Sequence, residues 1–351
     1  MKSKRLEYID IARGIAIILI VLGHTITYSQ NCRIIYKIIY SFHVALFFII
    51  SGYTYKIKKE ESFLIFFKRK FTRIMVPYYI WAFIFIIPFY IFGSSTGDAI
   101  GASYSMLSLK KIIFNVFYAN GNLFALKQNS ALWFLPSLFS MEIIYYNILK
   151  KCDNNKNLTF IFLILEFFVA IITYKFMKFI FPLGINTSLH FGIFYHIGYL
   201  MKKKNLMGSV TFNNVLFLIL ITIMGIFAAL LNYRIVSAID YAYGNLYLAI
   251  FSGIFLSISV LIFSKKIKRS KLLEYIGKNT MGILIFHKLI VLIMQSKLGI
   301  ISNLLKKSNS FVEIIIGISI ASIAIGFSLI INKVIKIICP IMVGEERKNI
   351  H

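Results

Sequence analysis

Long apolar stretches alternate with short polar ones along almost the whole chain. A helix crosses the hydrocarbon core of a bilayer with about 20 apolar residues. The pattern predicts ten such helices, at residues 9–28, 39–56, 74–92, 132–149, 158–177, 187–201, 212–231, 243–263, 275–294 and 312–338. We therefore expect an all-α integral membrane protein in which about ten transmembrane helices form one bundle.

The positions of the basic residues predict the orientation of this bundle. Lys and Arg collect in alternate loops, most densely in the run Lys68–Arg73 before the third span. Because cytoplasmic loops of membrane proteins are enriched in these residues, both termini are expected to be cytoplasmic. We expect a single membrane-embedded domain over residues 1–340 and a short cytoplasmic tail over residues 341–351.

Composition narrows the partners that the chain is expected to have. Hydrophobic residues make up 59% of the chain, and the formal net charge is +26. Because this charge follows the alternate loops of the predicted topology, we expect a lipid bilayer and no nucleic acid as partner. The cysteines and histidines form no metal-binding pattern, so no metal is expected. No P-loop or dinucleotide fingerprint occurs, so we expect no tightly bound cofactor.

The first span carries an acid, a guanidinium and an imidazole on one face. Arg13 and His24 are eleven residues apart, which in an α-helix leaves a rotation of about 20° and a rise of about 16.5 Å. Asp10 lies one turn before Arg13 on the same side. Such groups inside a membrane usually face a bundle interior or a water-filled cavity. A functional site competes with a structural interpretation, in which Asp10 and Arg13 form an ion pair and His24 is a packing residue.

The next three spans add further polar groups. His43 enters the second span at about the depth of the first span's histidine, and Ser51-Gly52 lies toward the cytoplasmic end, as a helix-packing notch or as part of a site. The run Lys68–Arg73 suits either anionic lipid or a cytoplasmic phosphate site. Glu142, near the middle of the fourth span, needs a partner, and Arg13 is one candidate.

Residues 93–131 form the longest predicted outer stretch, rich in Gly, Ser, Asn and aromatic residues. Within it, residues 107–118 have an amphipathic pattern, which predicts a helix on the membrane surface or one that re-enters the membrane. We expect this stretch to be a lid over an outward-facing pocket.

Five motifs occur in order along the chain. They are Arg13-x10-His24, Phe42-His43 with Phe47–Tyr53, a basic pair before Ile74-x-x-Pro77-Tyr78, Trp133–Pro136, and Gly277–Thr280 with His287. Together they resemble the multi-pass membrane acyltransferases of acyltransferase family 3 that O-acetylate cell-surface glycans, especially the fucose 4-O-acetylase-like branch. One position departs from the family, in which Arg-x-x-Arg is usual before the third helix. Lys70 stands at the first of these positions and cannot make the bidentate contact of an Arg.

The resemblance implies an enzyme, an acyl-CoA-dependent O-acyltransferase. It would move an acetyl group from cytoplasmic acetyl-CoA to a sugar hydroxyl of a cell-surface polysaccharide or lipid-linked glycan. It would be a multi-pass protein of the inner (plasma) membrane of the bacterial cell envelope. His24 and Arg13 are then the catalytic residues, with His24 as base or acyl carrier. The implied substrate-binding residues are Asp10, His43, Ser51, Tyr53, Arg69, Lys70, Arg73, Trp133, Glu142, Asn279 and His287.

The predicted topology suggests a different role for the residues at each side of the membrane. The basic side chains at the cytoplasmic ends would meet the phosphates of acetyl-CoA. Ser51, Tyr53 or the His43 ring would donate to the tetrahedral oxyanion near His24. The alternative is a flippase or exporter of a glycan intermediate, because intramembrane acids and histidines also occur in transporters. A non-catalytic scaffold does not explain five polar sites inside the spans.

Overall fold

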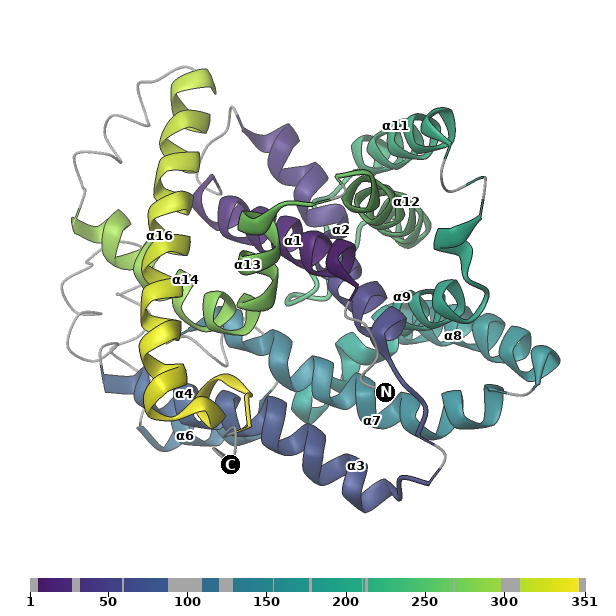
Figure 1. Ribbon diagram of the computed structural model, residues 1–351, viewed down its shortest axis with the longest axis horizontal. Helices are drawn as coiled ribbons and strands as arrows, with labels where there is room; N and C mark the ends of the chain where they lie inside the picture. Colours follow the sequence, from purple (N-terminus) through teal and green to yellow (C-terminus); the bar gives the residue numbers. More distant parts are fainter. Residues whose placement is uncertain are drawn as a thin grey trace.

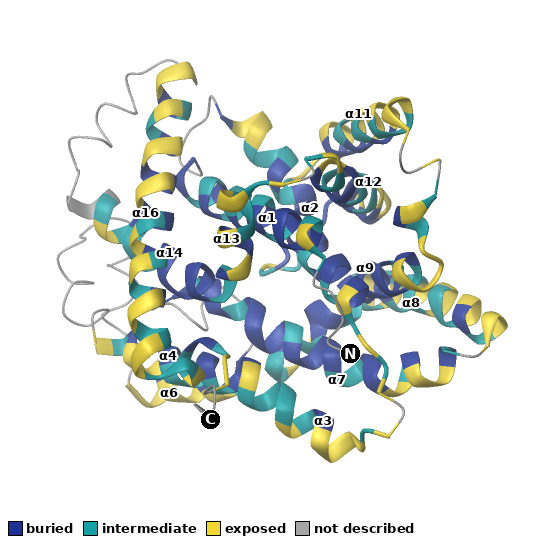
Figure 2. Ribbon diagram, viewed as in Figure 1, coloured by how far each residue is buried: buried dark blue, intermediate teal, exposed yellow. Residues whose placement is uncertain are grey.

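The computed structural model (Figure 1) describes residues 6–26, 32–58, 60–87, 109–119, 129–153, 155–176, 179–209, 211, 214–267, 269–297 and 310–346. These residues form helices joined by turns and contain no β-sheet. The predicted all-α class is confirmed. The buried residues gather in the middle of the bundle, and the outer helices expose many large apolar side chains (Figure 2). Exposed apolar faces of this kind are suited to contact with the hydrocarbon core of a lipid bilayer.

The α-helices of the described residues lie at the ten predicted spans, except that α3 (Phe63–Lys70) and α6 (Leu109–Tyr118) lie outside them. They are α1 (Glu7–Thr25), α2 (Arg33–Thr54), α3 (Phe63–Lys70), α4 (Val76–Ile84), α6 (Leu109–Tyr118), α7 (Phe134–Cys152), α8 (Lys156–Phe176), α9 (Ile185–Lys203), α11 (Val215–Leu231), α12 (Leu246–Lys266), α13 (Lys271–Lys278), α14 (Thr280–Lys297) and α16 (Ser310–Ile338). Within the described ranges, six helices are long and apolar enough to cross a membrane, or up to seven if the bent pair α13–α14 is one span.

Helix α1 lies at the centre of the bundle (Figure 1). It packs against α2, α12, α13, α14 and α16, while α2 also packs against α9 and α12. The helix that carries the polar stripe is therefore surrounded by protein, which is the arrangement that makes intramembrane ionisable groups tolerable.

Glycines bring the central helices into backbone contact. A Cβ on Gly52 of α2 would meet the Tyr195 carbonyl of α9, and one on Gly198 of α9 would meet the Ile49 carbonyl of α2. In the same way, Gly277 of α13 lies against the Asp10 carbonyl of α1. Gly52 is therefore the packing notch that the sequence left as one of two alternatives.

The ninth predicted span is broken. Helices α13 and α14 meet at Asn279 with a bend of 82°. The Asn279 amide group donates to Tyr275 O at 2.7 Å, and its Oδ1 accepts from Asn332 Nδ2 and Lys336 Nζ of α16, both at 2.8 Å. The expectation of one helix over 275–294 is thus wrong, because α16 supplies the hydrogen bonds that hold the bend.

The third predicted span also has an irregular start. Helix α3 continues through a π-helical turn, Phe71–Met75, into α4, and Pro77 follows directly. The C-terminal turn Pro340–Val343 packs over this segment. Trp81 donates to Met342 O at 2.8 Å, and Gly344 lies against the Arg73 carbonyl. The predicted tail thus begins inside a packed turn.

Helix α6 confirms a helix within the amphipathic stretch 107–118. Its buried residues Ile112 and Val116 face α4, where the Tyr78 hydroxyl donates to Val116 O at 2.8 Å. Most of the predicted lid over 93–131 lies outside the described residues.

Candidate functional site

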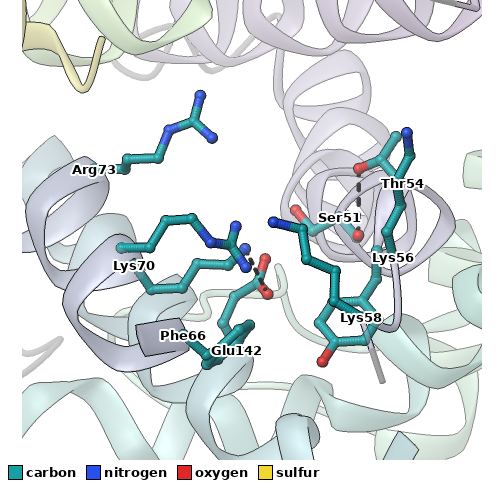
Figure 3. Close-up of a pocket in the computed structure, with 10 residues that line it drawn as sticks. Ser51, Thr54, Lys56, Lys58, Phe66, Lys70, Arg73 and Glu142 are labelled. Carbon is teal, nitrogen blue, oxygen red and sulfur yellow. Dashed lines mark hydrogen bonds and ion pairs between the residues drawn. The ribbon is translucent and has the colours of Figure 1, made fainter. Parts of the chain in front are cut away.

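A cavity of about 210 Å³ opens between the C-terminal end of α2 and the α3–α4 segment (Figure 3). We call it the basic cavity. Its lining residues are Ser51, Thr54, Tyr55, Lys56, Lys58, Phe66, Arg69, Lys70, Arg73 and Glu142. Five of them are cations and one is a carboxylate. Its volume is roughly that of seven water molecules, which is enough for phosphate groups.

Glu142 holds the first basic position of the third-helix motif. Its Oε2 atom accepts from Lys70 Nζ at 2.8 Å (Figure 3). The same atom accepts from the Tyr195 hydroxyl at 3.0 Å. The pairing of Glu142 with Arg13 that we considered from the sequence is therefore wrong. A buried carboxylate requires such a partner, and the register between α3 and α7 gives it Lys70.

Glu61, in the linker before α3, holds the neighbouring basic residue. The Arg69 guanidinium donates to both carboxylate oxygens, at 3.1 and 2.8 Å. These hydrogen bonds hold the pKa of the Glu61 carboxyl below its ordinary value. The Tyr146 hydroxyl fixes the same linker by donating to Glu61 O at 2.5 Å. Arg69 is thus positioned mainly by Glu61.

Arg73 is the cavity cation whose guanidinium extends toward the open space (Figure 3). Within the described ranges it makes no ion pair with a carboxylate. The π-helical turn that carries it departs from α-helical register, and such turns are frequent at functional sites. Arg73 can therefore bind an anion without first releasing a protein partner.

Arg13 lies beside the basic cavity. Its guanidinium donates to the Thr54 hydroxyl, a lining group, at 3.3 Å and to Asp10 Oδ1 at 3.5 Å. Asp10 is buried and Arg13 is half-buried. The ion pair of the structural interpretation is thus confirmed, and it sits next to the cavity.

At the other end of α1, several rings and an amine surround His24. We call this the histidine cluster, and it consists of His24, Tyr40, His43, His287 and Lys288. The His24 and His287 rings are 5.4 Å apart between centroids, and Lys288 Nζ lies 3.5 Å from His24 Nδ1. The centroid of the Tyr40 ring lies 6.5 Å from that of the His24 ring and 4.6 Å from that of the His43 ring. The structure thus brings three predicted site residues together.

Backbone carbonyls fix the tautomers of two of these rings. His43 Nδ1 lies 2.9 Å from Ile39 O, and His287 Nδ1 lies 2.7 Å from Ile283 O. Because a carbonyl only accepts, each Nδ1 carries the proton, and in the neutral ring each Nε2 is an acceptor. The expectation that the His43 ring donates to an oxyanion does not suit this tautomer.

Ser51 and Tyr53 lie far from His24. They are eight and ten residues beyond His43 on α2, a rise of about 12–15 Å. Ser51 lines the basic cavity, and the Tyr53 hydroxyl bonds the Tyr8 hydroxyl at 2.6 Å. Neither hydroxyl can therefore reach an oxyanion at His24.

The two remaining predicted residues support α14. Asn279 uses its side-chain amide to hold the bend before this helix. Trp133 belongs to a 3-10 turn, Ser130–Trp133, that packs against α14. Just before that turn, Asn129 Nδ2 donates to Ile285 O at 2.7 Å. Asn279 and Trp133 thus help to position α14, which carries His287 and Lys288 beside His24.

Sequence reasoning missed Lys288 and Tyr40. Lys288 carried a signal, because it is a lysine inside an apolar span and directly follows His287. Tyr40 carried none, because tyrosines are frequent at the ends of membrane helices. Its ring packs on Gly23, where an added Cβ would come within 2.8 Å of the ring.

A comparison with protein families covers nearly the whole chain. A family model described as an acyltransferase domain matches residues 6–332. This range includes every residue of the basic cavity and of the histidine cluster. No curated protein and no solved structure matches the chain.

Proposed function

The chain belongs to acyltransferase family 3, and from this membership we propose that it moves an acetyl group from acetyl-CoA to a sugar hydroxyl of a cell-surface or lipid-linked glycan. Its apolar helices make it a membrane protein. We assign it to the inner (plasma) membrane with both termini in the cytoplasm, because its basic loops follow that orientation.

One observation carries the proposal: a single helix joins a cationic cavity to a histidine cluster. Arg13 contacts the lining of the cavity, and His24 lies about 16.5 Å further along α1. Acetyl-CoA has its phosphates at one end and its thioester at the other end of a long, thin arm. A donor bound by its phosphates in the basic cavity would extend the thioester toward His24.

The chemistry proceeds at His24. The imidazole removes the proton of the acceptor hydroxyl, and the hydroxyl oxygen attacks the thioester carbonyl carbon. The tetrahedral intermediate then breaks its carbon–sulfur bond, and the departing thiolate takes the proton from His24. In a second route, His24 itself accepts the acetyl group and passes it to the hydroxyl. Release of CoA in the absence of acceptor separates the two routes, since only the second releases it.

The proposal is tested with purified protein in proteoliposomes, labelled acetyl-CoA and a glycan acceptor. Wild-type protein is expected to transfer label, and His24→Ala to lose transfer while keeping its affinity for CoA. Arg13→Ala is expected to lower both the rate of transfer and the affinity for CoA. Arg234→Ala, which changes an exposed arginine after α11, serves as the control. Full activity of His24→Ala at equal protein amounts would contradict the assignment of His24.

The exporter alternative makes a different prediction in the same system. An exporter moves the glycan intermediate across the vesicle membrane without consuming acetyl-CoA. Mass spectrometry of surface glycans from cells with and without the gene identifies the acetylated hydroxyl. A wild-type protein that neither releases CoA nor changes glycan acetylation would overturn the proposed function.

A further inference from the structure

Lys288 is a cation in the middle of an apolar helix, and it has an unusual partner. Its Nζ atom lies 3.5 Å from His24 Nδ1, and the lysine is half-buried. Within the described part of the chain, no carboxylate pairs with it. An ammonium group inside a bundle normally pairs with an acid, because an uncompensated charge there is costly.

Among the residues that the structure describes, the groups in contact with Lys288 supply no negative charge. His24 lies beside it, the His287 ring packs on the His24 ring, and the Tyr40 ring contacts both His24 and His43. Tyr40 completes the cluster as a neutral ring. A cation held among neutral imidazoles is therefore suited to a negative charge that arrives with a ligand or forms during a reaction.

We propose that Lys288 is a catalytic residue whose ammonium group stabilises the negative charge that forms on the thioester carbonyl oxygen during acyl transfer. The inference rests on the proposed function. The hydroxyl oxygen forms its bond to the carbonyl carbon as the hydroxyl proton moves to His24. The carbonyl electron pair moves onto oxygen beside Lys288. When the carbonyl re-forms, the carbon–sulfur bond breaks and the thiolate takes the proton from His24.

The contact also assigns roles to the two nitrogens of His24. When the Lys288 ammonium donates to Nδ1, that nitrogen holds the lone pair and Nε2 holds the proton. Nδ1 is then the atom that accepts the hydroxyl proton, once the ammonium has turned its N–H from this lone pair to the thioester carbonyl oxygen. The reacting oxygen and carbon must lie within about 3.5 Å of each other beside this nitrogen. The ammonium, which has three N–H donors, is within reach of the carbonyl oxygen at that place.

No other predicted donor serves this position. Ser51 and Tyr53 lie about 12–15 Å beyond His43 along α2, and His43 Nδ1–H is used by a backbone carbonyl. The bend at Asn279 is what directs α14, and with it Lys288, toward the His24 end of α1. The oxyanion donor thus comes from a helix that sequence reasoning assigned only a histidine.

The test measures kcat, the KM for acetyl-CoA and the KM for the glycan acceptor in Lys288→Met and Lys288→Arg. Loss of one oxyanion donor lowers kcat by about 100- to 1,000-fold, so Lys288→Met is expected to lose at least about 100-fold in kcat. The two KM values are expected to stay within about threefold, because the charge forms only in the transition state. Lys288→Arg keeps a cation and is expected to recover at least about tenfold of the loss.

Matched measurements separate catalysis from folding and from binding. Lys333→Met is the control, because Lys333 is an exposed lysine of α16, and it should retain wild-type kcat. CoA affinity should be the same in Lys288→Met and wild type. The Tm of Lys288→Met in detergent should be no lower than that of wild type, because the substitution removes an uncompensated charge from the bundle. A Lys288→Met enzyme with wild-type kcat would overturn the proposal, and so would an arginine variant no faster than the methionine variant.

A rise in KM with unchanged kcat would also overturn the proposal, since Lys288 would then bind a carboxylate or phosphate of a substrate in the ground state. Absence of transfer by wild-type protein is a separate result. It would overturn the proposed function, and the role of Lys288 with it.

Discussion

The cations of the basic cavity differ in how firmly the protein already holds them. Arg69 donates two hydrogen bonds to Glu61, and Lys70 pairs with Glu142. Arg73 extends into the space without a carboxylate partner among the described residues. Because forming a new ion pair costs least where no old one must break, Arg73 is the residue through which a phosphate should bind most strongly.

We expect Arg73→Ala to raise the Kd for CoA by about tenfold or more, since a hydrogen bond to a charged group contributes about 1.5–3 kcal/mol. The kcat at saturating donor should change little, because the phosphates lie far from the reacting carbon. Isothermal titration of CoA in detergent measures the affinity. Arg234→Ala is the matched arginine control, and an unchanged Kd in Arg73→Ala would refute this role.

The Glu61–Arg69 pair should give the protein a measurable acid sensitivity. The pKa of Glu61 is lowered in the folded state from its ordinary value of 4.5. Its contribution to the free energy of unfolding is therefore present above pH 4.5 and is lost as the pH falls through the folded pKa. We expect Glu61→Gln to lower Tm by a few degrees at neutral pH, about 1 kcal/mol. The difference should shrink below pH 4.5, and a constant difference would contradict the assignment.

At the scale of elements, the close approach of α13 to α1 determines where the histidine cluster lies relative to the basic cavity. Gly277 packs on the Asp10 carbonyl, and Gly14 of α1 packs on the Leu273 carbonyl of α13. After the bend at Asn279, α14 reaches the His24 end of the same helix. One broken segment therefore contacts α1 beside Arg13 and again beside His24.

A side chain at Gly277 should separate these helices. We expect Gly277→Val to destabilise the bundle by more than about 2 kcal/mol, because its Cβ would collide with backbone atoms that cannot move aside. Thermal unfolding in detergent measures the change. Gly326→Ala is the control, because a Cβ on Gly326 of α16 meets nothing within 4 Å. Equal Tm values for the two variants would contradict the tight contact.

The sequence predicted where the helices lie along the chain, but much less about which side chains contact one another across helices. Apolar runs predicted a helix at each span, and the spacing of Arg13 and His24 predicted one polar face on α1. The bend at Asn279 was not predictable, because Asn332 and Lys336, more than fifty residues away, hold it. The partner of Glu142 was missed for the same reason, since the register of α3 against α7 decides it.

At the scale of the whole molecule, positive charge should govern donor binding. The formal net charge is +26, and the basic cavity adds a local excess of cations. In nanodiscs of zwitterionic lipid, we expect CoA affinity to fall as NaCl rises from about 0.05 M to about 0.3 M, because salt screens these interactions. Pantetheine lacks the phosphates and is the control ligand. Salt-independent CoA binding would contradict a phosphate site.

The C-terminal turn gives the molecule an order of assembly. Residues 340–346 close over the segment that carries Arg73, through the bond from Trp81 to Met342 and the packing of Gly344. Lys336 of α16 also bonds Asn279 and pairs with Glu345 at 2.6 Å. The ribosome makes this turn after all the helices described here. A chain released early would contain every predicted catalytic residue and still lack the turn that packs on the Arg73 segment.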